Sequence, residues 1–190
     1  MGTRLESRER KLIERTSRRA MGAAVLASLL VVGAAQAAAP HSKAVLSAYA
    51  DSAAGESLLA GHYTEVIERL GSHGNEFASD QVGASTNLCV ALIMTRQLQA
   101  AHSACDEAIE DAKLDVTEET IAARTTHDEE VALAYSNRAV LEWLSDHRTA
   151  AADDLSRARA FAPASEFVTQ NLTALRASGT PAPAVAAAHG

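Results

Sequence analysis

The sequence predicts an all-α fold for the chain after residue 40, on three observations. Alanine is frequent while only 4% of the 190 residues are aromatic. A core of this kind is built by small residues that let helices cross closely, with Leu, Ile and Val filling the gaps. Only four prolines and ten glycines interrupt the chain. In addition, no long strand-like run is expected after residue 40.

The first 37 residues have the three-part order of a secretion signal. Residues 3–19 are basic, Met21–Val32 is an uncharged apolar run, and small residues follow it. This order predicts a signal peptide over residues 1–37 that is cleaved between Ala37 and Ala38. The mature protein is then expected in the periplasm.

A membrane anchor is the alternative for this leader. Met21 to Ala39 is a stretch of 19 largely apolar residues, near the minimum for a transmembrane helix. If it is not cleaved, the domain would be anchored in the inner membrane and face the periplasm. After cleavage, no membrane association is expected.

Charge is unevenly distributed between the leader and the rest. Residues 1–37 carry seven Lys/Arg and three Glu, a net charge of +4. Because the whole chain has a net charge of −7, the remaining residues carry −11. An acidic body argues against nucleic acids and anionic membrane surfaces as partners. It is compatible with a soluble surface that binds a neutral or basic partner.

A repeated spacing of small residues is clearest between Tyr135 and Pro163. Its members are Ala139, Ala151, Leu155, Ala158 and the terminating Pro163. The alanines suit the close crossing of two antiparallel helices, Leu155 fills the space between them, and proline ends the second helix. This spacing resembles the tetratricopeptide repeat.

Two further copies precede this one. Cys89, Ala101, Cys105 and Ala108 repeat the register, and a weaker copy contains Ala54, Val66 and Leu70. The predicted turns contain Gly61-His62-Tyr63, Arg96-Gln97 and Asp146-His147. The resemblance predicts a domain over residues 41–177 with these parts: repeats at about 47–80, 82–113 and 132–163, an insertion at 114–128, and a capping helix at 165–177. A generic bundle of α-hairpins is the alternative.

Asn87, Asn137 and Asn171 share one register, which supports this alignment, and the last two are 34 residues apart. Residues 178–190 contain Pro and Gly without apolar periodicity, and a disordered tail is expected there.

The resemblance implies a short right-handed solenoid of antiparallel hairpins whose first helices line a concave groove. Asn87 and Asn137 match a position where related repeats present an amide to a ligand backbone. The alternative is that these amides cap or bridge neighbouring helices. Trp143 is expected in core or inter-repeat packing, with a groove anchor as the other interpretation. The family's clamp for acidic peptide termini needs several Lys and Arg that the matching face lacks.

Cys89 and Cys105 are the only cysteines, and the repeat places them on facing helices. A disulfide is expected in the oxidising compartment that follows export. Two buried free thiols are the alternative.

No catalytic, metal or cofactor motif is recognised. Seven histidines are scattered without a pair at ligand spacing, so no metal site is expected. The sequence therefore predicts a non-catalytic interaction or scaffold module that binds a protein or peptide in its groove. A structural or assembly role in the cell envelope as a homo-oligomer is the alternative, with residues 41–52 available for pairing in a homodimer. An enzyme or small-molecule binder is the third hypothesis.

Overall fold

The computed structural model describes residues 43–72, 80–114, 120–177 and 184–188. All of them belong to one compact unit, Pro40–Gly190. The leader, including Ala37 and Ala38, lies outside the described residues. Within the described ranges, no helix has both the length and the hydropathy required to span a membrane.

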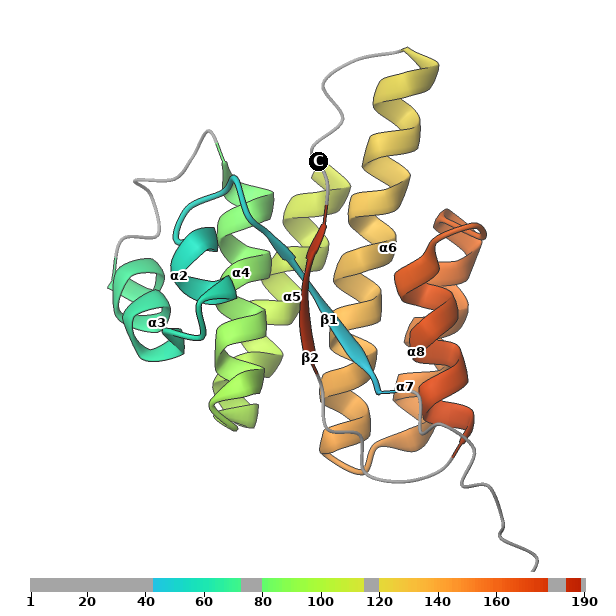
Figure 1. Ribbon diagram of the computed structural model, residues 1–190. Helices are drawn as coiled ribbons and strands as arrows, with labels where there is room; N and C mark the ends of the chain where they lie inside the picture. Colours follow the sequence, from blue (N-terminus) through green and yellow to red (C-terminus); the bar gives the residue numbers. More distant parts are fainter. Residues whose placement is uncertain (1–42, 73–79, 115–119, 178–183, 189–190) are drawn as a thin grey trace, which may run out of the picture. The chain divides into compact units, whose positions relative to one another are not determined.

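The described residues are mostly helical, and their seven helices pack antiparallel (Figure 1). The elements are α2 (Gly55–Leu59), α3 (Tyr63–Ser72), α4 (Gln81–Met94), α5 (Leu98–Leu114), α6 (Ile121–Leu144), α7 (Arg148–Phe161) and α8 (Glu166–Arg176). Helices α2 and α3, α4 and α5, and α6 and α7 form three successive hairpins, and α8 packs against α6 and α7.

The three hairpin turns have the same backbone geometry. Each contains one residue with left-handed φ: Gly61 at 84°, Arg96 at 61° and Asp146 at 62°. In each turn the next amide donates to the carbonyl five residues back, at 2.8–3.0 Å, and the left-handed residue donates to the carbonyl three residues back. This pattern satisfies the last carbonyls of the first helix. The predicted turn positions are therefore confirmed.

The insertion expected at residues 114–128 extends a helix. Its last residues form the first two turns of α6, which begins after Thr120, whose hydroxyl accepts a hydrogen bond from the amide of Ala123 at 3.1 Å. Residues 115–119 lie outside the described part. Ser165 precedes α8 as expected, although its side chain makes no capping hydrogen bond.

The fold departs from all-α because two strands form a small parallel sheet. Strand β1 (Val45–Tyr49) pairs with β2 (Ala184–Ala188), so that Val45 lies opposite Ala184 and Tyr49 opposite Ala188. The all-α prediction did not include these two short strands, and part of the tail expected to be disordered forms β2. A run of five residues is too short to be recognised by periodicity alone, and its partner is more than 130 residues away.

The core follows the predicted packing of small residues. Ala101, Ala108, Ala151 and Ala158 are at most 1% exposed, and they lie where the second helix of a hairpin meets its neighbours. Cys89 on α4 and Cys105 on α5 form a disulfide with a Cα–Cα distance of 4.8 Å. It joins the two helices of the middle hairpin, and a loop of this length stabilises the fold by about 3 kcal/mol on the chain-entropy estimate.

Candidate functional site

Three asparagines from three helices hold strand β1 by its backbone. The amide oxygen of Asn171 accepts from the Val45 N–H at 2.6 Å, and its nitrogen donates to the Val45 carbonyl at 2.8 Å. Asn137 does the same for Ser47, at 2.7 and 2.9 Å. Asn87 on α4 repeats the pattern on Tyr49, at 2.9 and 3.0 Å. We call Asn87, Asn137 and Asn171 the asparagine ladder.

The spacing of the ladder matches the period of a strand. Backbone groups of residues i, i+2 and i+4 face the same edge of an extended chain, so one edge of β1 is bound by α8, α6 and α4 in turn. The strand therefore runs across the helices in the reverse of their chain order (Figure 1). The backbone groups of Leu46 and Ala48 face the opposite edge, where β2 pairs.

The ladder is fully inside the protein. The three asparagines are 0–1% exposed, and Val45 to Tyr49 are all buried. A buried amide is costly without partners, and here each amide binds both polar groups of one backbone residue. Net contributions of about 1 kcal/mol per bond make the ladder worth several kcal/mol of stability.

Side chains of β1 add apolar contacts on both sides. Leu46 and Ala48 belong to the main core, together with Val140 of α6. Tyr49 packs with Leu133 in a separate small cluster that Phe167 covers. Side-chain packing and backbone hydrogen bonding thus hold the same five residues, so β1 is an integral part of the domain.

The chain leaving β1 is also tied down. Asp80, just before α4, accepts from the Ala53 amide and the Ser52 hydroxyl, both at 2.7 Å. Asn87 donates a further bond to the Ala53 carbonyl at 3.2 Å. At Gly55 a Cβ atom would overlap the carbonyl oxygens of the end of β1, so this close approach requires glycine.

Charged groups beside the ladder lie on other faces of the helices. Arg138 on α6 binds both carboxylate oxygens of Asp154 on α7 at 2.8 Å, and donates to Asp106 on α5 at 2.6 Å. The hydrogen bonds to Asp154 raise the pKa of Arg138 above its usual value, so the guanidinium stays charged. This bridge fixes α6 relative to both neighbouring helices.

Tyr49 is the titratable group of the strand. Burial raises the pKa of its hydroxyl above the usual value, and the charges of Glu130 and Glu129 act in the same direction. Within the described residues, this hydroxyl has no hydrogen-bond partner.

The resemblance implies that Asn87 and Asn137 present their amides to the backbone of a ligand. Both amides bind an extended backbone, and that backbone is the chain's own β1. Asn171 does the same and also donates to the Ser136 hydroxyl at 2.8 Å, which bridges α8 to α6. The register that Asn171 shares with Asn87 and Asn137 was the signal in the sequence that could have predicted this backbone-binding role. Sequence reasoning missed the strand itself.

Trp143 lies apart from the ladder. It packs against a cluster of Ala139, Leu155 and Leu175, and Arg148 lies over its ring at 4.4 Å. It also lines a hollow of about 270 Å³ between α7 and α8. Trp143 therefore takes part in the packing between helices.

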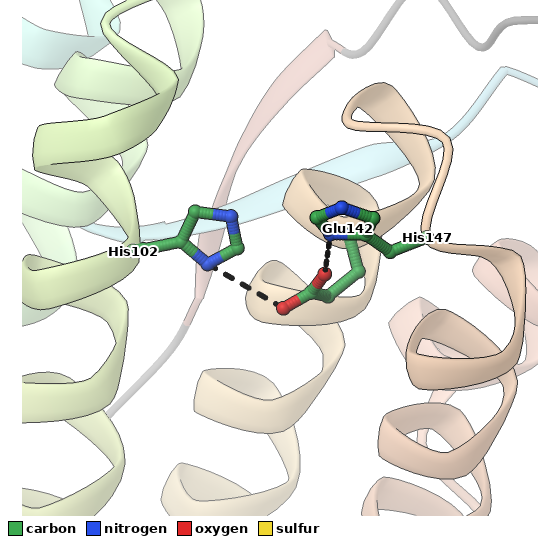
Figure 2. Close-up of side chains that lie close together, drawn as sticks. All are labelled: His102, Glu142 and His147. Carbon is green, nitrogen blue, oxygen red and sulfur yellow. Dashed lines mark hydrogen bonds and ion pairs between the residues drawn. The ribbon is translucent and has the colours of Figure 1, made fainter.

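A second polar cluster joins residues that the sequence treats as unrelated. His102 on α5, Glu142 on α6 and His147 at the start of α7 converge, and their ligand atoms all lie within 4.8 Å of one another (Figure 2). His102 and Glu142 are 40 residues apart, so no local spacing could reveal the cluster.

Comparisons with protein-family models, with curated proteins and with solved structures found no match to this chain.

Proposed function

We propose that the chain is an exported, non-catalytic protein-binding module, built as a short tetratricopeptide-like solenoid, and that it binds an extended segment of a partner polypeptide as a strand beside β1. The observation that carries the proposal is the asparagine ladder. It binds the backbone atoms along one edge of β1, and the opposite edge is the one at which a strand pairs, here β2.

Support for the solenoid comes from the repetition of structure along the chain. Three hairpins close with the same turn geometry, and α4, α6 and α8 each contribute one asparagine to the same strand. In repeat proteins, equivalent residues of successive units usually line one surface.

The binding edge is formed by the backbone of Leu46 and Ala48. In this structure, β2 lies there in parallel register, and its sequence is Ala-Val-Ala-Ala-Ala. Strand addition uses main-chain hydrogen bonds for affinity and side-chain size for specificity. We infer that the partner segment is extended, uncharged and rich in small apolar residues, as β2 is, and that it takes the place of β2.

A labelled peptide of residues 181–190 tests this proposal against a host of residues 40–180. We expect saturable binding to this host, and binding at least about tenfold weaker to residues 40–190, because the tethered strand competes at high effective concentration. In this parallel register the amide of Ala186 faces β1 and that of Ala187 faces away. A peptide with Ala186→Pro should therefore lose binding, and one with Ala187→Pro should retain most of it.

Two results would contradict the proposal. One is a host that is folded by circular dichroism and does not bind the peptide, and the other is equal binding of both proline peptides. If the shortened host does not fold, residues 40–190 with Ala186→Pro replace it, because that change frees the edge without removing residues.

Exchange of β2 between two copies is a second candidate, and it corresponds to the homo-oligomer alternative. It is favoured by the few partners of β2, whose main contacts within the described residues are with β1 and α2. Light scattering after size exclusion distinguishes the two: a dimer that Ala186→Pro converts to a monomer supports exchange, and a concentration-independent monomer excludes it.

A further inference from the structure

His102, Glu142 and His147 surround one point between two hairpins. The Nδ1 atom of His102 lies 3.4 Å from one carboxylate oxygen of Glu142, and the Nδ1 atom of His147 lies 2.8 Å from the other. Figure 2 shows the two rings directed toward this carboxylate, His102 from α5 and His147 from the start of α7. The ring centroids are 6.1 Å apart and the ring planes are tilted by 39°.

We propose that these three side chains form a Zn²⁺ site, with both histidines bound through Nδ1, Glu142 bound through a carboxylate oxygen, and water completing the coordination. Two imidazole nitrogens and one carboxylate are a donor set that suits Zn²⁺ among the divalent ions. The proposal is independent of the function proposed above.

The distances fit this assignment. Ligand atoms bound tetrahedrally at about 2.0–2.2 Å from zinc are about 3.4 Å from one another. Here the ligand atoms all lie within 4.8 Å of one another, so small side-chain rotations bring them to that spacing. The backbone of α5 and the α6–α7 turn need not move.

Burial of the three residues also fits an accessible metal site. The side chain of Glu142 is 13% exposed and that of His102 is 27% exposed, whereas that of His147 is 60% exposed at the turn. The two more enclosed ligands are held by their helices, and the exposed one leaves a path for the ion and for water. Among the described residues, this is the group of three such side chains that could hold an ion.

His62 provides a matched contrast within the chain. It also follows a hairpin turn and lies near a carboxylate, since its Nδ1 is 3.8 Å from Glu65. That pair has no third ligand in the described residues and both side chains are mostly exposed. A general tendency of turn histidines to attract zinc would affect both positions equally.

Zinc at this place would join α5 of the middle hairpin to the turn of the next one. Because the unfolded chain does not hold the three ligands together, binding would raise the melting temperature in proportion to the logarithm of the zinc concentration.

The test is titration calorimetry with ZnCl₂ on tag-free, chelator-treated residues 40–190, one compact unit. We expect one equivalent to bind. His102→Ala and His147→Ala should each weaken binding at least about tenfold, and His62→Ala should leave it unchanged. Nitrogen-15 NMR should show that the Nδ1 atoms of His102 and His147 shift on zinc addition and that those of His62 do not.

Absence of saturable binding would overturn the proposal, as would equal affinities of the parent and the His147→Ala variant. His147 is exposed, so its replacement leaves the fold intact and keeps this comparison valid. An effect of His62→Ala as large as that of His147→Ala would show adventitious binding and would also overturn it.

Discussion

Replacing Asn137 with alanine removes the middle contact of the asparagine ladder. The change eliminates two hydrogen bonds and leaves the N–H and C=O groups of Ser47 inside the protein without their partner. Each buried group left unsatisfied costs about 1–3 kcal/mol, so we expect the loss of both partners to cost about 2–6 kcal/mol. That is a large part of the 5–15 kcal/mol by which domains are typically stable.

Urea denaturation of residues 40–190 measures this loss. With a slope of about 2 kcal/mol/M, the middle of the usual range for small proteins, the midpoint should fall by roughly 1–3 M at an unchanged slope. Gln97→Ala is the control, because it removes an exposed amide whose bond to Thr95 is 3.1 Å long. Its effect should stay within about 0.5 kcal/mol.

Asn137→Asp separates lost hydrogen bonds from lost volume. Aspartate has the size of asparagine, but one of its oxygens would face the Ser47 carbonyl, and its charge would be buried. It should therefore destabilise at least as much as alanine. A loss below about 1 kcal/mol for Asn137→Ala, or a stable Asn137→Asp variant, would refute the ladder as the main support of β1.

Two further changes test the surroundings of the strand. Burial raises the pKa of Tyr49 in the folded state above its unfolded value of about 10. The resulting contribution to the free energy of unfolding is therefore fully present below about pH 10. It is lost as the pH rises from about 10 toward the folded-state pKa, at up to about 1.4 kcal/mol per pH unit. Tyr49→Phe should thus reduce the fall of the urea midpoint between pH 10 and 11, and equal pH profiles of the two proteins would contradict this. At pH 7 the same change should be neutral or should stabilise the fold by about 1 kcal/mol, because the buried hydroxyl has no partner among the described residues. Gly55→Ala should lower the melting temperature, because the new Cβ atom would clash with the end of β1. Gly71→Ala lies in open space on α3 and should raise the free energy of unfolding by about 0.5–1 kcal/mol. Similar effects of the two changes on stability would contradict this expectation.

Much of the helical architecture could be predicted because its causes are local. Small residues at hairpin spacing, turn residues and a terminating proline act over a few helical turns, and the predicted turns at Gly61, Arg96 and Asp146 are where the helices end. The proximity of Cys89 and Cys105 followed from the same hairpin geometry.

The strands could not be predicted in this way. Val45–Tyr49 becomes a strand because three amides and a distant segment bind its backbone, and nothing within five residues encodes those partners. The register of Asn87, Asn137 and Asn171 was visible in the sequence. What the amides bind depends on which chain lies across them.

The sequence by itself determined the two later helical hairpins, the three turns and the alignment of three asparagines, since each follows from spacing along the chain. The first predicted repeat, at about 47–80, is different at its start, because residues 45–49 form β1 and α2 begins only at Gly55. Only the tertiary structure decided that the asparagines hold the protein's own β1, and that His102, Glu142 and His147 meet. Except for the local pair Glu142–His147, both depend on contacts between residues 38 or more positions apart, and such contacts are set by the packing of whole helices rather than by any local pattern.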